Sequence, residues 1–102
     1  MRRLGPTVVA VLQAVADGTA YGFEIIERTG LPSGTVYPAL SRLERDGYLR
    51  SAWEDDEAAF AEGRPARRYY RVTAAGARAL AAAVAQYHAL LPARPARARS
   101  GA

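Results

Sequence analysis

The first half of the chain carries three segments with the hydrophobic spacing of α-helices. In residues 5–17, apolar side chains recur at the i, i+3, i+4 and i+7 positions of one face, and the opposite face is apolar too. A helix that is apolar all round must be covered on more than one side, so this pattern favours contact with a second copy of the chain. Residues 20–29 and 33–46 follow as two further helices, each ended by a glycine.

Local signals predict how the second and third helices begin. Thr19 is the expected N-cap of the second helix, and Ser33 or Thr35 is the expected N-cap of the third. Glu24 and Arg28 are four residues apart, which is the spacing of an ion pair on one helical face.

The second and third helices are joined by a short turn, which is the arrangement of a helix-turn-helix. Pro38 fits the third helix only in or near its first turn, because backbone N–H groups have no helical partner there. The outer face of the third helix is polar. This favours a DNA partner over a protein partner, although a solvated helix face looks the same.

Two strands and a last helix complete the pattern. Residues 48–53 and 67–72 alternate as strands do, and an acidic loop over 54–66 separates them. A final helix is expected over 74–91, capped by Thr73, with apolar side chains at the spacing of a seam between helices. The order of three helices, strand, long loop, strand and helix predicts a mainly α (α+β) winged helix-turn-helix, in which the loop is the wing.

The domain organisation is simple. Residues 1–91 are expected to form one DNA-binding and dimerisation domain. Residues 92–102 are rich in alanine, arginine and proline, and we expect them to be a disordered basic tail.

Composition excludes several kinds of chemistry. The chain has no cysteine, no lysine and one histidine, so disulfides, thiol nucleophiles, Cys-based zinc sites and Schiff bases are ruled out. No metal, cofactor or enzymatic activity is expected, because no nucleophile, base and stabiliser stand together. The longest apolar run, residues 8–16, is too short to span a bilayer, and no signal peptide is recognisable. We therefore expect a cytoplasmic protein with no membrane partner.

Charge is distributed unevenly. The formal net charge is +4, but residues 54–63 hold five of the ten acids and no arginine. The rest of the chain therefore carries 14 arginines against five acids, a net of +9. A basic surface of this kind attracts phosphate, and its binding weakens as salt rises.

The candidate DNA contacts come from two places. Hydroxyls and backbone N–H groups at a helix start grip phosphate, and arginine pairs with guanine or phosphate. On the third helix the candidates are Ser33, Gly34, Thr35, Tyr37, Pro38, Ser41 and Arg42. In the wing they are Arg64, Arg67 and Arg68, since arginine is favoured in a narrow minor groove. Two alternatives stay open: Tyr37 as a half-buried aromatic under the wing, and the wing arginines as strand residues that cover apolar surface and pair with Asp or Glu.

Apolar residues of the first and last helices are the candidates for a homodimer interface. They are Val8, Val9, Leu12, Leu80, Val84, Tyr87 and Leu91. Trp53 is interpreted as a packing residue where the wing meets the body, with a stacking platform for a small aromatic effector as the alternative.

Two motifs in this order are similar to those of a known family. The run Gly34-Thr35-x-Tyr37-Pro38-x-Leu40 and the run Arg67-x-Tyr69-Tyr70-x-x-Thr73-x-x-Gly76 resemble the PadR family of bacterial transcriptional regulators. The resemblance covers roughly residues 5–80. It implies a homodimeric winged-helix protein, usually a repressor, that reads a palindromic operator. A single helix after the wing resembles the short subfamily, and some relatives respond to aromatic effectors. The alternative is a winged helix that binds another protein.

Overall fold

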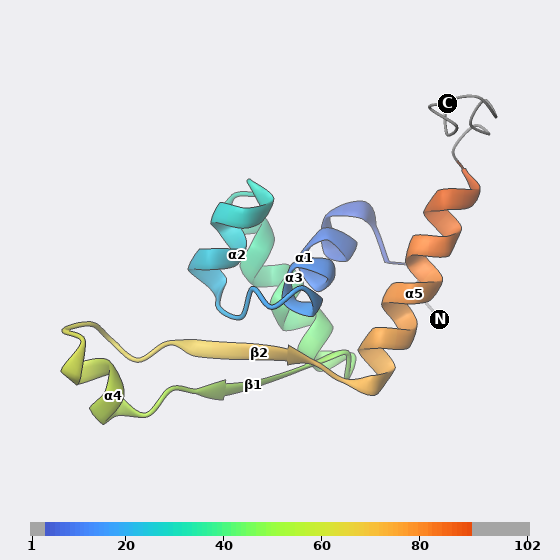
Figure 1. Ribbon diagram of the computed structural model, residues 1–102. Coiled ribbons are helices and arrows are strands. Elements are labelled where there is room, and N and C mark those ends of the chain that lie inside the picture. Colours follow the sequence, from blue (N-terminus) through green and yellow to red (C-terminus); the bar gives the residue numbers. More distant parts are fainter. Residues whose placement is uncertain (1–3, 91–102) are drawn as a thin grey trace, which may run out of the picture.

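The computed structural model describes residues 4–90. In chain order its elements are α1 (Pro6–Ala16), α2 (Gly22–Thr29), α3 (Ser33–Arg45), β1 (Leu49–Trp53), α4 (Asp56–Ala61), β2 (Arg68–Val72) and α5 (Ala74–Ala89). The first three helices pack above the β1–β2 hairpin, which projects to one side, while α5 rises from the other end of the hairpin (Figure 1). This arrangement confirms the mainly helical winged-helix fold with a two-stranded antiparallel sheet. Within residues 4–90, no helix is long and apolar enough to cross a lipid bilayer.

α1 is the centre of the hydrophobic core, where it contacts α2, α3, α5 and β2. Its buried residues are Val11, Leu12, Ala14 and Val15. Val8 and Val9 are partly buried against the same core. Leu12 was expected at a dimer interface, but its exposed fraction is 0% within one chain, so it is a core residue. Much of the all-round apolar character of α1 is thus satisfied by its own chain.

The other fully buried side chains come from α2, α3 and β1. They are Ile25, Val36, Leu40, Leu43 and Leu49. Each buried side chain of this size contributes about 1.5–3 kcal/mol relative to leaving it exposed. The α3 members recur at helical spacing, so they fix which face of α3 turns inward and which faces solvent.

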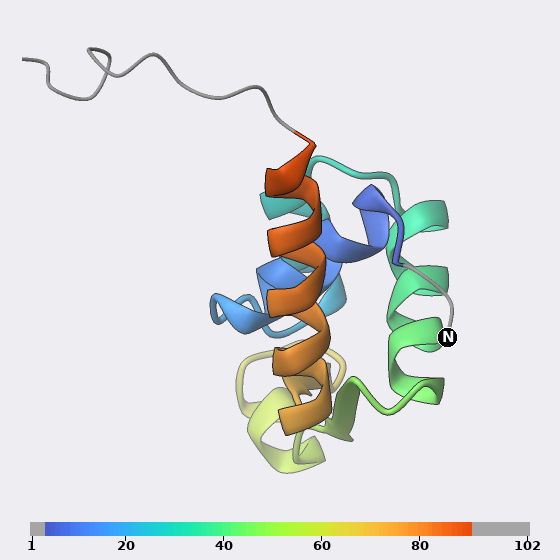
Figure 2. The ribbon, with the colours of Figure 1, turned by 90° about the vertical axis from the view of Figure 1, so that its right-hand side faces the viewer.

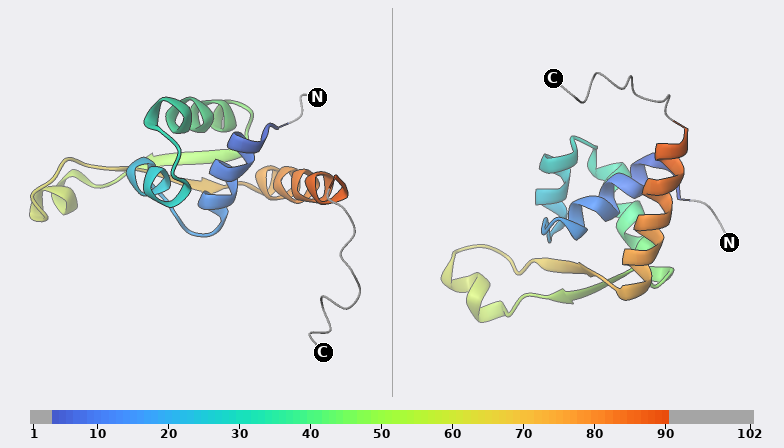
Figure 3. Two further views of the ribbon diagram at one scale, coloured as in Figure 1. Left: turned by 90° about the horizontal axis from the view of Figure 1, so that it is seen from above. Right: turned by 45° about the vertical axis from the view of Figure 1, so that its right-hand side comes forward.

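The hairpin is antiparallel, with Leu49 opposite Val72 at one end and Trp53 opposite Arg68 at the other. Leu49 is buried against the helices, whereas Trp53 at the wing end is 66% exposed. Burial therefore decreases along the strands toward the wing, which projects beyond the helical body (Figure 3).

The segment before α2 attaches the hairpin to the helices. The Tyr70 N–H group donates a hydrogen bond to the Ala20 carbonyl oxygen at 2.7 Å, and Tyr21 forms an isolated bridge with Tyr69. The two tyrosine rings also meet edge to face, with their centroids 5.6 Å apart. These contacts fix the second strand against the start of α2.

The start of α2 differs from the sequence prediction. Tyr21, not Thr19, is the N-cap residue, and it makes no side-chain cap hydrogen bond. Thr19 is buried and accepts a hydrogen bond from Arg28 Nη1 at 3.1 Å. Arg28 pairs with Asp17 at 3.2 Å, and Glu24 accepts from the Ala20 N–H group. The predicted Glu24–Arg28 ion pair is wrong because the chain before α2 offers closer partners to both side chains.

The start of α3 also lacks the predicted side-chain cap. Pro32 is the N-cap residue, with no side-chain cap hydrogen bond, so neither Ser33 nor Thr35 caps the helix. Pro38 lies inside the helix as its sixth residue, which is the second turn and not the first. Proline has no N–H group to donate to the carbonyl oxygen four residues earlier, so the Gly34 carbonyl lacks its usual helical donor.

The wing is not the simple loop that its acidic composition indicated, because it contains α4. Ala59 of α4 is buried at 1% exposure, whereas the neighbouring Phe60 is 84% exposed. Alanine favours helix, and Asp56 and Glu57 in the first turn suit the positive end of the helix dipole. The buried alanine turns the wing into a small folded unit.

The last helix begins as predicted, since the Gly76 N–H group donates to Thr73 Oγ1 at 2.9 Å. The Tyr87 hydroxyl donates to the Leu4 carbonyl oxygen at 2.8 Å, which ties α5 to the beginning of the chain. α5 forms the outermost layer on its side of the molecule (Figure 2). Leu91 and the expected disordered tail, 92–102, lie outside the described residues.

Candidate nucleic-acid interface

The base of the wing and the helix-turn-helix face each other across a cleft of about 740 Å³. Its walls include Phe23 of α2 and Tyr37 and Ser41 of α3. From the hairpin they include Trp53 of β1, Arg68 at the start of β2, and Arg67 just before it. Phe23 and Trp53 are 61% and 66% exposed, which is unusual for such large apolar side chains. The cleft thus combines aromatic faces, hydroxyls and guanidinium groups, which are the groups that contact sugar and phosphate.

Tyr37 packs against α2 and is also partly exposed to the cleft. A Cβ atom placed on Gly22 would lie 2.5 Å from the Tyr37 ring, so the ring packs directly on the backbone of α2. Its side chain is nevertheless 46% exposed and lines the cleft. The absence of a side chain at Gly22 is what allows this half-buried position.

The other α3 candidates lie on or near its outer face. Ser33, Gly34, Pro38 and Ser41 are exposed, whereas Thr35 and Arg42 are half-buried. The Arg42 Nε atom lies 3.6 Å from an Asp46 carboxylate oxygen one turn later on α3. This loose ion pair holds Arg42 along the helix and leaves part of its guanidinium accessible.

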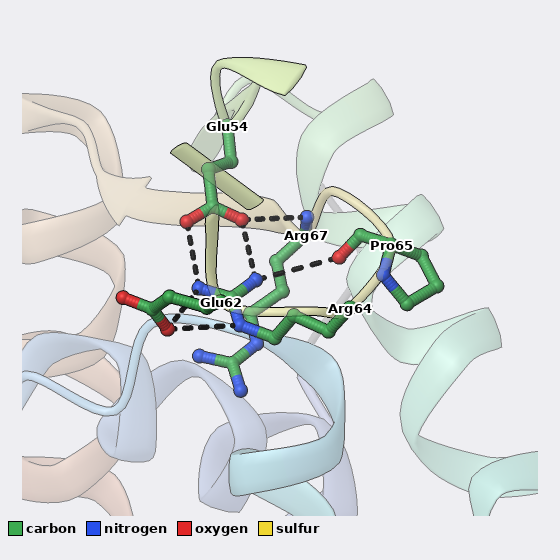
Figure 4. A network of polar contacts seen from close by, with 5 residues as sticks. All are labelled: Glu54, Glu62, Arg64, Pro65 and Arg67. Atoms are coloured by element: carbon green, nitrogen blue, oxygen red, sulfur yellow. Dashed lines mark hydrogen bonds and ion pairs between the residues drawn. The ribbon is translucent and has the colours of Figure 1, made fainter. Parts of the chain in front are cut away.

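Arg64 is engaged inside the wing (Figure 4). Its two terminal nitrogens donate to the two carboxylate oxygens of Glu54 at 2.6 and 2.8 Å, and Glu62 accepts from Nε at 3.2 Å. The side chains of Arg64 and Glu54 are only 19% and 14% exposed. Hydrogen bonding to Arg64 lowers the pKa of Glu54 to about 2, and the same pair raises the pKa of Arg64.

Arg67 and Arg68 lie in different surroundings. The Arg67 guanidinium lies over the Tyr21 ring, 4.1 Å from its centroid, and among residues 4–90 it forms no ion pair with an acidic side chain. Arg68 pairs with Glu44 at 3.2 Å and donates to Ser51 Oγ at 2.9 Å. Arg67 is therefore the wing cation with the fewest competing partners in its own chain.

The Arg68 guanidinium lies near two aromatic rings that line this cleft, those of Trp53 and Tyr70. Arg68 lies 5.9 Å from the Tyr70 ring centroid, and burial raises the pKa of the Tyr70 hydroxyl. Tyr70 is thus neutral at physiological pH, and its ring acts as a packing surface beneath the arginine.

Of the predicted dimer residues, Leu80 and Val84 line one groove, whereas Tyr87 is hydrogen-bonded within its own chain. A groove of about 840 Å³ between α1 and α5 is lined by Leu80, Val84 and a row of alanines. Val84 is 37% exposed, while Leu80 is nearly buried at 9%. The Tyr87 hydroxyl is bonded within its own chain, as described above. Trp53 lines the wing cleft and not this groove, so the structure separates it from the proposed dimer seam.

The sequence pattern gave Tyr21, Phe23 and Glu54 no role at this interface. Tyr21 supports Arg67, Phe23 lines the cleft, and Glu54 binds Arg64. Continuing the strand register one pair beyond Trp53 and Arg68 places Glu54 opposite Arg67, and this was the one available signal for its position.

Comparison with known proteins agrees with this geometry. The family model of the PadR-like transcriptional regulators matches residues 11–82. This chain belongs to the PadR-like family. A comparison with curated proteins finds no match.

Solved structures of PadR-like regulators share the fold. A PadR family transcriptional regulator from Eggerthella lenta is 32% identical, with a TM-score of 0.68 over 81% of this chain and 72% of that chain. A PadR family transcription regulator from Clostridium difficile R20291 has a TM-score of 0.73 at 22% identity, covering 84% of this chain and 91% of that chain. The PadR-like chain is thus a DNA-binding regulator of transcription, in a family of regulators and not of enzymes.

Proposed function

We propose that this PadR-like regulator acts as a homodimeric repressor that binds a palindromic operator. The outer face of α3 enters the major groove, and the wing base, through Arg67 and Arg68, contacts the adjoining backbone or minor groove. One observation carries the proposal: Tyr37 and Ser41 of α3 line one cleft together with Arg67 and Arg68 of the wing base. Arg64 is left out of this interface because its guanidinium is occupied by Glu54. Such a regulator works on genomic DNA in the cytoplasm.

The interface divides into reading and holding contacts. Ser41 and Arg42 lie along α3, where side chains reach base edges from the major groove. Ser33 and Gly34 lie at its start, where backbone N–H groups point outward and suit a phosphate. Arg67 supplies the phosphate contact of the wing.

Dimerisation through the α1–α5 groove supports palindrome reading. The lining of the groove is mostly apolar, with Gln13 and His88 as its polar members, and its alanines allow a second helix to approach closely. A two-fold dimer presents two α3 helices, and operator half-sites about 34 Å apart, one turn of DNA, would match them. Part of the apolar surface of α5 is then covered by the partner copy.

Fluorescence anisotropy tests the proposal. The probe is a labelled duplex carrying the inverted repeat nearest upstream of the protein's own gene, with a scrambled duplex of equal length as the control. We expect binding to the repeat to be at least about a thousandfold tighter at physiological salt. Equal binding to both duplexes would contradict operator recognition and favour the protein-binding alternative.

A salt series identifies the wing contact. Arg67→Gln should lower the slope of log affinity against log salt by about one per chain, because one phosphate contact is lost. Arg78→Gln, an exposed arginine of α5, is the matched control and should leave the slope unchanged. Equal slopes for wild type and Arg67→Gln would place the phosphate contact elsewhere.

A further inference from the structure

The ion pair between Glu54 and Arg64 inside the wing suggests a role for these two residues other than direct contact with DNA. We propose that Glu54 and Arg64 are positioning residues, whose ion pair closes the base of the wing and holds Arg67 in place for the DNA backbone. This inference rests on the proposed function, since it concerns the same interface. It replaces the sequence expectation that Arg64 itself reaches DNA.

The first step is the geometry of the pair. The Arg64 fork meets both oxygens of Glu54 at 2.6 and 2.8 Å, and its Nε atom is used by Glu62. A bidentate guanidinium–carboxylate pair is stronger and more directional than a single contact. A phosphate would have to displace a carboxylate to reach Arg64, because Glu54 and Glu62 already neutralise the charge of Arg64 within the wing.

The second step connects this pair to Arg67. The Oε1 atom of Glu54, which Arg64 holds, also accepts a hydrogen bond from the Arg67 backbone N–H group at 3.2 Å. The Glu54 N–H group donates to the Arg67 carbonyl oxygen at 2.7 Å. Glu54 therefore grips both sides of the Arg67 peptide backbone, one residue pair beyond the end of the hairpin ladder.

The third step is where this leaves the Arg67 side chain. Its guanidinium lies 4.1 Å from the centroid of the Tyr21 ring, at the wall of the cleft. Tyr21 is itself fixed to the second strand through Tyr69. The backbone is held by Glu54 and the head by Tyr21, so Arg67 presents its charge to the cleft with little freedom to lose on binding.

The fourth step is the contact that Arg64 makes with α4 of the wing. The Arg64 backbone N–H group donates to the Ala59 carbonyl oxygen at 3.2 Å, and Ala59 is buried. Arg64 thus joins α4 to the wing base by its backbone and to Glu54 by its side chain. The wing folds as one unit around this residue.

The direction in which DNA affinity changes when Glu54 loses its charge distinguishes a positioning role from a simple electrostatic effect. Removing an acid from a DNA-binding protein should strengthen its attraction to phosphate. If Glu54 positions Arg67, Glu54→Gln should instead weaken operator binding by about tenfold, while binding to scrambled duplex stays equal or rises. Glu57→Gln is the matched control: it removes the same charge from an exposed side chain of α4.

A second variant keeps the net charge constant. Lysine binds phosphate as a point charge but cannot form the two parallel bonds of a guanidinium. Arg64→Lys should therefore lose about tenfold in operator affinity if Arg64 closes the wing base. Wild-type affinity for Arg64→Lys would overturn the proposal and return Arg64 to a phosphate contact.

Amide hydrogen exchange, measured without DNA, tests the role of Glu54 independently of operator recognition. In the free protein, Glu54→Gln should speed the amide hydrogen exchange of Arg67 at least about tenfold, while amides of α1 and α3 keep their protection and show an intact core. If wild type did not distinguish the two duplexes, the proposed function would fail, and the exchange of Arg67 would still decide the role of Glu54. Exchange at Arg67 that is identical in Glu54→Gln and Glu57→Gln would overturn the proposal.

Discussion

At the residue scale, Gly34 is a glycine that the fold of its own chain does not require. It lies in the first turn of α3, and no atom lies within 4 Å of the position where its Cβ would be. Glycine in a helix costs about 0.5–1 kcal/mol relative to alanine, and it permits close approach of another backbone. We interpret this open position as space for the DNA backbone.

Gly34→Ala should therefore have opposite effects on stability and on binding. We expect the free energy of unfolding in urea to rise by up to about 1 kcal/mol. Operator affinity, measured by anisotropy, should fall by about tenfold, which is about 1.4 kcal/mol. A variant that is more stable and binds the operator equally well would show that DNA does not approach this residue.

Gly76 is the opposite case, because packing within the chain requires it. A Cβ atom at this position would collide with the Tyr48 carbonyl oxygen, which is backbone and cannot move aside like a flexible side chain. Gly76→Ala should lower the free energy of unfolding by about 3 kcal/mol, at the upper end of the cost of overpacking. Gly5→Ala is the control, since nothing lies within 4 Å of its Cβ position. Similar urea midpoints for the two variants would contradict this packing.

At the element scale, the wing is a folded unit because acids and arginines within it neutralise each other. Glu54, Glu62 and Arg64 belong to one network, and Ala59 of α4 is buried beside it. Opposite charge within the wing occupies the guanidinium of Arg64. Part of the acidic stretch of the sequence thus belongs to the internal structure of the element that we propose to contact DNA.

The low pKa of Glu54 gives this element a defined pH dependence. Its folded pKa is about 2, below the usual 4.5, so its contribution to stability is fully present above about pH 4.5 and is lost as pH falls toward 2. The stability difference between wild type and Glu54→Gln should be constant at neutral pH and shrink through this acid window. Unfolding curves measured at a series of pH values check this. A difference that changed near neutral pH would assign the effect to another group.

At the scale of the whole molecule, the α1–α5 groove is the surface through which we propose that two copies of the chain assemble. Val84 is its partly exposed apolar member, on the outermost helix. Val84→Glu places a charge where the proposed partner helix would cover it, and burying an unpaired charge is costly. We expect the dimer dissociation constant to rise at least about tenfold, measured by sedimentation.

The control for this experiment is Gln86→Glu, which adds a charge to an exposed position of α5 outside the groove. It should leave the dimer intact. Dissociation by both variants, or by neither, would contradict a dimer seam at this groove.

The sequence by itself determined the winged-helix fold, apart from the short helix α4 in the wing, together with the Thr73 cap and the family motifs, because helical period, strand alternation and turn residues are local properties. It could not predict that Leu12 lies in the core or that Arg28 pairs with Asp17, because these contacts depend on which segments pack against one another. The same limit applied to Arg64. The sequence left open whether Arg64 contacts DNA or pairs with an acid, and the hairpin turn brings Glu54 against it at 2.6 Å in a half-buried site. Tertiary structure alone decided which wing arginines pair with acids of their own chain, because the pairing depends on how the hairpin folds.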